Sequence, residues 1–424
     1  GAIKCRRGDG VMLRAVSKFG GSSVADAACV SRVVSLIKAP PADRARQHVV
    51  VSAPGKRSLP DGAPDIKVTD LLLKAHGLAA AKSRAEYDVT MTTIAARFME
   101  LCPGLASLQA GLDAAARDIY DHSALDTGFA ASRGEYLNGL VVAHETGMEF
   151  VDPADQFIIF GDDRKLDTTA TLEAVRRRVG CQLGAPGFVI PGFFGGVAGQ
   201  STPEMLQTMS RGGSDVTASL VAAALASDLG GGGDFSGVVH ENFTDVDGVY
   251  STDPRLCPAA RSMPHLSYAQ THALALAGAG VLHPDAVTPL VALGVPIHVR
   301  STWDAEGRGT WISGQGAEAS AENTASAENT EASVQAQARA TALAVAGSGG
   351  RLTVVCKEVA ERALGRRAVE SRVAAALTAR GLAFTHVGEG AHSDGALAVA
   401  VELSQASQLN AAVEAVFDDL LKPQ

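Results

Sequence analysis

The residues best suited to chemistry lie in two turns that combine glycines with a basic side chain. Lys18 precedes Gly20 and Gly21 in SKFGGSS, and Arg211 precedes a second Gly-Gly pair in SRGGSD. Glycines allow backbone N–H groups to approach an anion, and the start of a following helix adds a positive dipole end. Lysine supplies a point charge for a phosphoryl group, whereas the planar arginine fork can hold a carboxylate bidentately. Each turn alone is also typical of an ordinary glycine-rich connection, but together they predict two anions facing one cleft.

Two further segments carry charged side chains in compact patterns. SRGEY, at residues 132–136, is typical of a solvated helix start when taken alone. TDVDGVY, at residues 244–250, is followed by DPR, and its acidic pair and glycine are either ordinary turn chemistry or the surroundings of a nucleotide and its magnesium. The chain contains no GxxxxGK[ST] segment, which excludes a Walker-type phosphate loop.

These segments must be positioned by alternating strands and helices. Apolar runs predict strands at residues 11–19, 48–52, 157–160, 187–191, 238–244 and 297–300, and helical spacing predicts helices at 24–38, 71–85, 90–101 and 215–228. This alternation predicts an α/β fold with a mostly parallel sheet covered by helices on both faces. Ligands of such sheets bind at the carboxyl ends of the strands, where both glycine turns would lie.

The C-terminal part of the sequence has a different organisation. Residues 314–340 contain SAENT twice, and residues 314–338 hold four Glu but no Lys or Arg, which predicts a flexible acidic linker or a docking peptide. Residues 341–424 follow a strand–helix–strand–strand–helix order, which is most of a ferredoxin-like unit without its closing strand. We expect the apolar segment TALAVA, at 341–346, to fill that position in its own unit or in a partner chain's.

Composition limits the class of protein. The 424 residues carry a net charge of −9 without a basic block, which argues against nucleic acid or an anionic membrane as the main partner. No uncharged apolar run is long enough to span a bilayer, and the N-terminal residues lack the apolar core of a secretory signal. The six cysteines are scattered without the spacing of a structural zinc site or a disulfide framework, so we expect a cytoplasmic location and no protein-held metal.

Several segments together resemble one family. KFGGSSVAD, SAPGK, KVTD, SRGEYLNG, SRGGSD, ENFTDVDGVYSTDPR and VLHP occur in the order seen in aspartokinases of the amino-acid-kinase superfamily, over about residues 14–313. VVVSAPGK with ENFTDVDG is most similar to the clostridial monofunctional type, and residues 341–424 resemble the ACT regulatory module. The resemblance implies a three-layer α/β/α kinase domain at 11–313, the linker at 314–340 and one reduced ACT-like module at 341–424.

The resemblance also implies roles for individual residues. The catalytic pair would be Lys18, on the γ-phosphate of ATP, and Asp215, which holds Lys18 in place. Glu135 would bind the substrate α-ammonium and Arg211 its α-carboxylate, while Ser23, Thr69 and Ser214 complete the substrate site. With ATP and Mg²⁺ as cofactors, the nucleotide site would comprise Gly20, Gly21, Ser22, Thr244, Asp245, Asp247, Tyr250 and Arg255. The expected reaction converts ATP and L-aspartate to ADP and 4-phospho-L-aspartate, and a carboxylate that is already ionised needs no general base.

Other functions stay open at this point. A kinase of the same fold could act on another amino-acid-like carboxylate in a specialised pathway. A silent amino-acid sensor and a structural partner subunit are further alternatives, although intact Lys18, Arg211 and Asp215 argue against a silent chain. Two features depart from the family pattern: the glycine-rich segment at 230–237 and the single C-terminal module where two are usual. A homodimer formed through the ACT region, with weak or no inhibition by lysine or threonine, is therefore the expectation.

Overall fold

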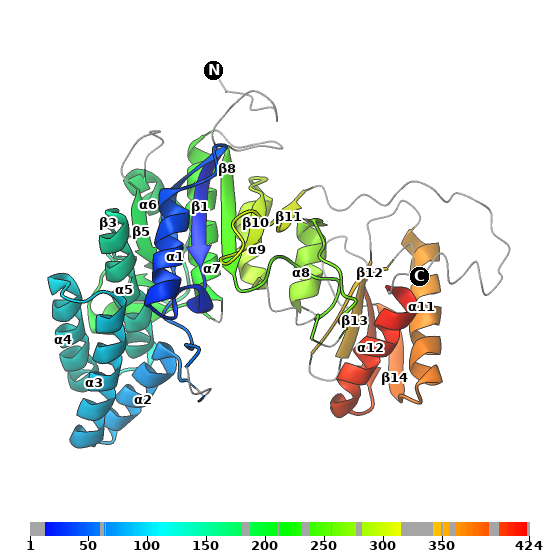
Figure 1. Cartoon of the computed structure of the whole chain (residues 1–424), viewed down its shortest axis with the longest axis horizontal. Helices are drawn as coiled ribbons and strands as arrows, with labels where there is room; N and C mark the ends of the chain where they lie inside the picture. Colours follow the sequence, from blue (N-terminus) through cyan, green and yellow to red (C-terminus); the bar gives the residue numbers. More distant parts are fainter. Residues whose placement is uncertain are drawn as a thin grey trace. The chain divides into compact units, whose positions relative to one another are not determined.

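The computed structural model describes residues 13–59, 63, 65–155, 157–179, 187–210, 212–229, 237–255, 257–276, 282–314, 342–348, 351–356, 362–389 and 398–421. The chain divides into two compact units. One comprises Gly1–Val246 with Asp285–Gly307, and the other comprises Asp247–Pro284 with Arg308–Gln424. Figure 1 labels the helices and strands of both units.

The first unit is built on parallel strands in the order β3-β5-β2-β1-β8-β10. β1 pairs in parallel with β2 and β8, and β8 pairs in parallel with β10. β5 pairs in parallel with β2 and β3. Their bounds are Leu13–Phe19 (β1), Arg44–Val51 (β2), Glu149–Phe150 (β3), Phe188–Pro191 (β5), Val238–Thr244 (β8) and Ile297–Ser301 (β10). A smaller sheet joins β4 (Ile159–Phe160), β6 (Phe194–Val197) and β7 (Leu206–Thr208). The expected α/β architecture with a mostly parallel sheet is confirmed.

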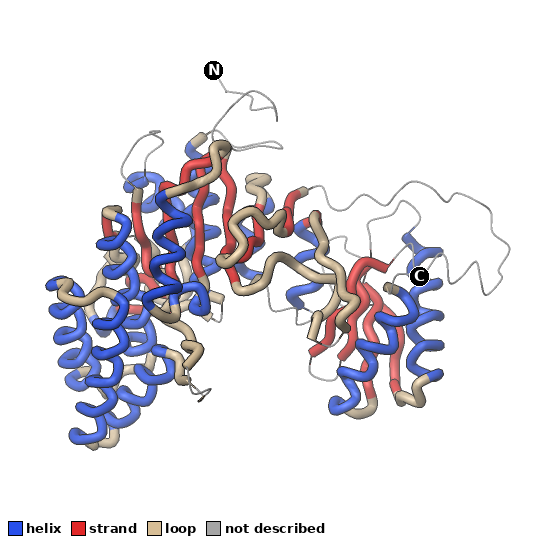
Figure 2. The backbone as a smooth tube through the Cα atoms, viewed as in Figure 1, coloured by secondary structure: helices blue, strands red, loops and turns tan. Residues whose placement is uncertain are grey.

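Helices cover both faces of this sheet (Figure 2). The helices are α1 (Ala27–Lys38), α2 (Val68–Ala80), α3 (Arg84–Leu101), α4 (Ala106–Asp121), α5 (Gly128–Thr146), α6 (Thr168–Val179), α7 (Gly213–Asp228) and α9 (Pro284–Val291), with short 3-10 turns at Gly21–Val24 and Pro203–Met205. Side chains alternate between faces along a strand. Phe19 and Phe243 stack at 4.7 Å in the core beneath α1 and α5, whereas Lys18 and Asn242, one position before them, lie on the side of α7.

The second unit contains a four-stranded antiparallel sheet in the order β12-β13-β15-β14. Its elements are β9 (His265–Ser267), α8 (Tyr268–Leu276), β11 (Thr310–Ser313), β12 (Ala342–Ser348), β13 (Arg351–Cys356), α11 (Arg362–Ala379), β14 (Phe384–Glu389), β15 (Ala398–Leu403), a 3-10 turn at Ala406–Gln408 and α12 (Leu409–Leu420). β12 pairs antiparallel with β13, so the vacant strand position is filled from within the same chain, as TALAVA predicted.

The core of the second unit extends beyond the expected C-terminal module. Val345 of β12 and Leu352 of β13 pack in one cluster with Cys257. The Val345 N–H also donates to the Ser251 carbonyl at 2.8 Å. The segment before β9 therefore belongs to the same compact unit as the ferredoxin-like sheet. The boundaries at 11–313, 314–340 and 341–424 remain a prediction, and residues 315–340 of the expected linker lie outside the described residues.

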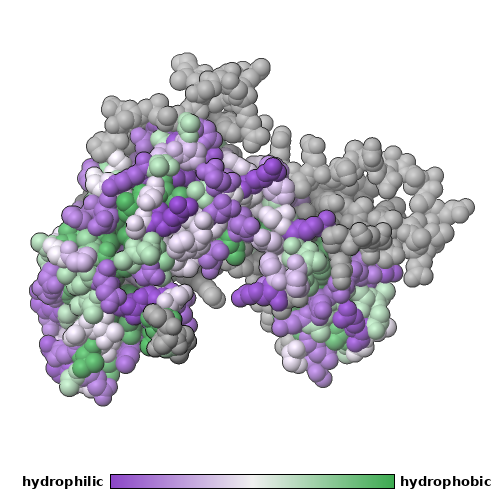
Figure 3. All heavy atoms as spheres, viewed as in Figure 1, coloured by the Kyte–Doolittle hydropathy of each residue, from purple (hydrophilic) through white to green (hydrophobic). Residues whose placement is uncertain are grey.

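The surface mixes residue types without a single dominant patch on the face drawn in Figure 3. Exposed large hydrophobic side chains such as Val89 and Trp303 occur singly, which is usual for globular proteins. Among the helices whose residues are described, none combines the length and the apolar character needed to cross a membrane.

Candidate active site

A buried ion pair joins the first strand to the helix after the second glycine turn. Lys18 Nζ lies 2.7 Å from Asp215 Oδ1, and both side chains are only 11% and 13% exposed. Asn242, the register partner of Lys18 on β8, contacts both: its Oδ1 accepts from Lys18 and its Nδ2 donates to Asp215, each at 3.4 Å. The carboxylate and the amide thus hold the ammonium in one place. Sequence reasoning missed Asn242, whose only signal is its position in the ENFT strand.

The first glycine turn is shaped by backbone contact. A Cβ on Gly21 would lie 2.9 Å from the Ala53 carbonyl oxygen, and one on Gly55 would lie 2.7 Å from the Gly21 carbonyl. The Gly55 N–H donates to that carbonyl at 2.9 Å, so the two turns touch where no side chain fits. A 3-10 turn containing Ser22 comes next, and Asp26 rather than a serine caps α1 by accepting from the Cys29 N–H.

Glu135 is a buried carboxylate in the middle of α5. Its side chain is 7% exposed, and Oε2 has no hydrogen-bond partner among the described residues. Burial raises the Glu135 pKa to about 8, against a smaller lowering by the Ala53 backbone N–H and by Arg133. The solvated helix start that SRGEY suggests in isolation is therefore wrong, because this segment lies inside a buried helix. A cationic group bound at Oε2 would offset the cost of burying the charge.

Arg133, from the same segment, lies among aromatic rings. Its guanidinium carbon is 4.6 Å from the ring centroids of Phe129 and Tyr136 and 5.2 Å from that of Phe194. Burial lowers the Arg133 pKa, and the guanidinium donates to Ser132 Oγ. Three of these four partners belong to α5 itself, and Phe194 of β6 is the one that connects Arg133 to a neighbouring element.

The segment Ser52–Gly55 connects Glu135 with the first glycine turn. A Cβ on Gly134 would meet the Ala53 side chain at 2.7 Å, so α5 lies directly against this segment. Asn138 Nδ2 donates to the Ser52 carbonyl, and Arg97 Nη2 donates to the Gly55 carbonyl, both at 2.8 Å. Ala53 consequently contacts the backbone of Gly21 on one side and α5 on the other. Arg97 lies in α3 outside any quoted motif, and Asn138 lies in SRGEYLNG, which assigned it no role of its own.

The remaining expected substrate residues lie in different parts of the first unit. Ser23, 1% exposed, shares a 2.7 Å hydrogen bond with Thr302, which follows β10. Ser214 lies in the first turn of α7, where Gly192 approaches so closely that a Cβ would be 2.6 Å from it. Thr69 is the second residue of α2 and is half-buried. Arg211 lies outside the described residues.

Phe193, which follows Gly192 between β5 and β6, has a strained backbone. Its φ of 81° lies in the left-handed region, which is unusual for a bulky side chain. The Thr217 hydroxyl accepts from the Phe193 N–H, and the Phe193 carbonyl accepts from Met209 at 2.8 Å. Strain of this kind is maintained by surrounding contacts and is often found at binding sites.

The expected nucleotide residues divide between the two units. Thr244 ends β8 and donates to the exposed Asp245 carboxylate at 3.0 Å in the first unit. In the second unit, the Tyr250 hydroxyl donates to Asp247 at 2.7 Å, which raises the tyrosine pKa. Arg255 pairs with Asp253 at 2.7 Å. Each set is a local surface arrangement within its unit.

A charged cluster on the opposite face of the sheet supports these strands. Glu241, fully buried on β8, accepts from Ser17 of β1 at 2.8 Å and pairs with Arg44, Arg46 and Arg300 at 3.0, 2.7 and 3.1 Å. The arginines, with Arg46 first, lower the Glu241 pKa to about 2 against the effect of burial. Ser17 and Glu241 directly precede Lys18 and Asn242. The Glu241 cluster therefore fixes the register of β1 and β8, the strands that carry Lys18 and Asn242 of the ion-pair cluster (Lys18, Asp215 and Asn242).

Comparison with curated proteins finds several aspartokinases. Aspartokinase 3 of Bacillus subtilis is 31% identical over 325 residues, which are 70% of this chain and 63% of that protein. A bifunctional aspartokinase/homoserine dehydrogenase of Haemophilus influenzae is 29% identical over 70% of this chain and 36% of its own length. The chain therefore spans less than two thirds of the length of these relatives.

Comparison with solved structures supports the fold. The aspartate kinase of Clostridium acetobutylicum aligns with 96% of this chain and all of its own at a TM-score of 0.68 and 23% identity. Aspartokinase III of E. coli, in complex with aspartate and ADP, aligns with 96% of this chain and 99% of its own at 0.68 and 19% identity. The sequence profile of the amino acid kinase family matches residues 13–301, which contain the whole ion-pair cluster and Glu135. The chain belongs to the amino acid kinase family.

Proposed function

We propose that this protein is an aspartate kinase, which transfers the γ-phosphoryl group of ATP to the side-chain carboxylate of L-aspartate. The products are ADP and 4-phospho-L-aspartate. The observation that carries the proposal is the buried Glu135 carboxylate, one oxygen of which has no hydrogen-bond partner in the described part of the chain. Ala53 packs between this carboxylate's helix and the glycine turn that follows Lys18. A carboxyl group held beside a phosphate turn, which ionises when it pairs with a cation, suits a substrate that carries an ammonium group near the carboxylate to be phosphorylated.

Each candidate residue has a separate role in phosphoryl transfer. Lys18 stabilises charge on the transferring group, and its pairing with Asp215 and Asn242 keeps the ammonium oriented before substrate binds. Gly20 and Gly21 let backbone N–H groups approach the phosphates. Glu135 binds the α-ammonium and Arg211 the α-carboxylate, with Ser23, Thr69 and Ser214 around the substrate. Positioning replaces acid–base catalysis, because the attacking carboxylate is already ionised.

ATP is the proposed phosphoryl donor, in line with the ADP in the E. coli aspartokinase III complex. Within the first unit, Gly20, Gly21 and Ser22 would contact its phosphates, with Thr244 and Asp245 as further nucleotide residues. Asp247, Tyr250 and Arg255 are the nucleotide residues proposed for the second unit. The exposed Asp245 carboxylate, which accepts only from the Thr244 hydroxyl among described contacts, is a hard oxygen donor that fits Mg²⁺. Magnesium would neutralise charge on the phosphates when bound.

A substrate panel tests the proposal. The full chain is incubated with Mg·ATP and, separately, with L-aspartate, L-glutamate, D-aspartate, succinate and 2-aminoadipate, and ADP release is followed by a coupled assay. We expect L-aspartate to give the highest kcat/KM, and hydroxylamine to trap an acyl phosphate as the hydroxamate. Preference for another amino-acid carboxylate would transfer the assignment to a same-fold kinase with a different substrate.

Two outcomes would overturn enzymatic function altogether. Calorimetric binding of an amino acid without ADP release would identify a sensor. The absence of both binding and turnover, in a protein shown by circular dichroism to be folded, would favour a structural subunit. Succinate provides the internal comparison, because it lacks the ammonium that Glu135 binds and should react far more slowly than L-aspartate.

A further inference from the structure

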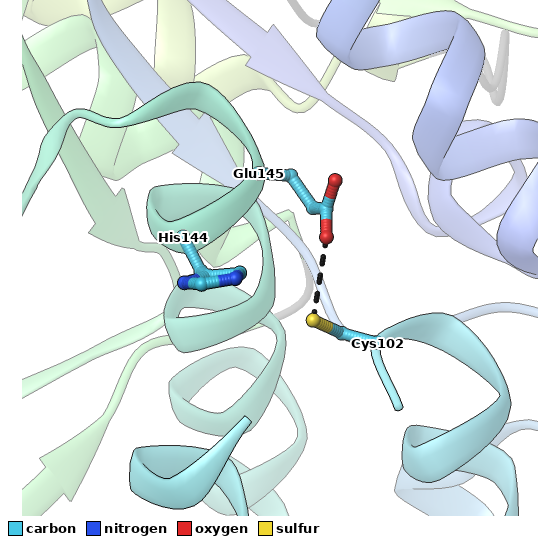
Figure 4. Close-up of side chains that lie close together, drawn as sticks. All are labelled: Cys102, His144 and Glu145. Atoms are coloured by element: carbon cyan, nitrogen blue, oxygen red, sulfur yellow. Dashed lines mark hydrogen bonds between the residues drawn. The ribbon is translucent and has the colours of Figure 1, made fainter. Parts of the chain in front are cut away.

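A second group of reactive side chains lies at the ends of two helices, apart from the residues assigned above. Cys102 caps the C-terminal end of α3, and His144 and Glu145 lie in the last turn of α5. One sulfur, one nitrogen and one oxygen atom of the three residues lie within 4.8 Å of one another (Figure 4). Glu145 follows Glu135 by ten residues on α5, which separates the two by about 15 Å along the helix axis.

The donor set is that of a zinc ion. Thiolate, imidazole and carboxylate are its usual protein ligands, at about 2.3, 2.0 and 2.1 Å, and three of them leave a fourth position for water. Tetrahedral geometry at these bond lengths separates ligand atoms by about 3.5 Å. Cys102 Sγ and Glu145 Oε1 are already 3.3 Å apart, and a His144 nitrogen lies within 4.8 Å of both, so the imidazole would have to move closer to complete the set. Magnesium, which prefers oxygen ligands, would not select a thiol.

The electrostatics of this corner favour a cation. The C-terminal end of the 19-residue α5 is the negative end of its dipole. Lys38 Nζ already donates to the Glu145 backbone carbonyl at 2.7 Å, and the Glu145 carboxylate accepts from the Cys102 thiol. Because Lys38 is exposed and flexible, it can move aside.

In the structure, a thiol proton lies between two of the three possible metal ligands. The Cys102 thiol donates a hydrogen bond to the Glu145 carboxylate. Binding of Zn²⁺ would form a sulfur–zinc bond, break the S–H bond and release that proton to solvent. Cys102 is 4% exposed, while the exposed His144 gives the ion a way in.

We propose that Cys102, His144 and Glu145 bind one Zn²⁺ ion, which clips the end of α3 to the end of α5. The consequence for the protein is mechanical. α5 carries Glu135, and a metal clip at its last turn would restrain the helix without touching substrate. The site is independent of the proposed kinase activity, so its test does not depend on turnover.

The experiment is metal titration of the full chain after treatment with a chelator. Isothermal calorimetry with ZnCl₂ in two buffers of different ionisation enthalpy measures affinity and proton release together. We expect one Zn²⁺ per chain and release of about one proton from the Cys102 thiol. Titration with Co²⁺ should produce the ultraviolet charge-transfer band of a cobalt–thiolate bond, and Zn²⁺ should raise the thermal transition temperature.

Single substitutions assign the ligands. Cys102→Ser should remove the cobalt–thiolate band, and Cys102→Ser, His144→Ala and Glu145→Gln should each weaken Zn²⁺ binding by at least about tenfold. Cys29→Ser is the matched control, because Cys29 is a buried free thiol on α1 and should leave binding unchanged. If Cys102→Ser does not fold, the exposed His144→Ala decides the question. Failure of the folded wild type to bind, or undiminished binding by His144→Ala and Cys102→Ser, would overturn the proposal.

Discussion

At the scale of single residues, the chemistry depends on charges whose partners lie far away in sequence. Lys18 and Asp215 are separated by 197 positions, yet their 2.7 Å contact determines where the ammonium points. The family resemblance already paired Asp215 with Lys18, but only the fold gives the distance between them and the third residue that contacts both. Asn242 contacts both partners, yet the ENFTDVDG motif that contains it assigned this residue no role.

Replacing Lys18 tests its role directly. We expect Lys18→Ala to remain folded and to lose about 10²–10⁴-fold in kcat, the scale of removing a major stabiliser of transition-state charge. A coupled ADP-release assay measures turnover, and circular dichroism checks the fold. Lys74→Ala, an exposed lysine on α2, is the control and should retain full activity. Turnover at the wild-type rate in folded Lys18→Ala would show that Lys18 is only structural.

The raised pKa of Glu135 predicts a pH dependence. Burial raises this pKa to about 8, so the carboxyl of the free protein is mostly protonated below that pH and ionised above it. Only the ionised form pairs with an ammonium, so kcat/KM for the amino acid should rise between about pH 6 and pH 8, because this ratio reports the free enzyme.

Glu135→Gln separates this effect from other titrations. The amide cannot ionise, so the rise with pH should disappear, and kcat/KM should fall by about 30- to 4,000-fold, equivalent to roughly 2–5 kcal/mol for a desolvated charge pair. The KM for ATP should change little. A pH profile that keeps its wild-type shape in Glu135→Gln would assign the titration to another group.

At the scale of elements, the register of β1, β8 and β10 depends on one buried acid. Glu241 faces three arginines from two other strands, and Arg46 and Arg300 also lie 5.0 and 5.6 Å from the Phe243 ring centroid. Removing the acid leaves several buried cations without their partner. We expect Glu241→Gln to lower the free energy of unfolding by about 3–5 kcal/mol.

Urea denaturation measures this loss, and the exposed pair of Arg57 with Glu100 provides the comparison. Glu100 is 63% exposed, so Glu100→Gln should cost less than about 1 kcal/mol. The Glu241 pKa falls from 4.5 to about 2 on folding, so its stabilisation is complete above about pH 4.5 and is lost as pH falls toward 2. Equal effects of the two substitutions would contradict a structural role for the cluster.

The C-terminal elements followed local pattern more closely. Alternating and helical apolar spacing predicted β13, α11, β14, β15 and α12 in the right order, and the missing strand was found upstream in TALAVA. The pattern did not indicate that Cys257 would share the same core as Val345. Such packing depends on which surfaces meet after both segments have formed, and neither segment alone contains that information.

At the scale of the whole molecule, assembly and regulation remain predictions. We expect the full chain to sediment as a homodimer joined through the ferredoxin-like sheets, and to show weak or no inhibition by lysine or threonine. Removing residues 314–424 would also remove Val345 and expose Cys257, so the test uses the intact chain. A full-length monomer would refute the assembly, and strong cooperative inhibition by lysine would refute the regulatory expectation.

Sequence alone determined the alternation of strands and helices, the two glycine turns and the identity of most candidate residues. These are local properties, because apolar spacing and glycine placement act through neighbouring positions of the chain. Tertiary structure alone decided that SRGEY is buried, that Ala53 lies between Glu135 and Gly21, and that Cys102 meets Glu145 across 43 positions. Burial and contact arise only when separate elements pack together. They change the protonation and the partners of a side chain, and the neighbouring residues in the sequence do not indicate these changes.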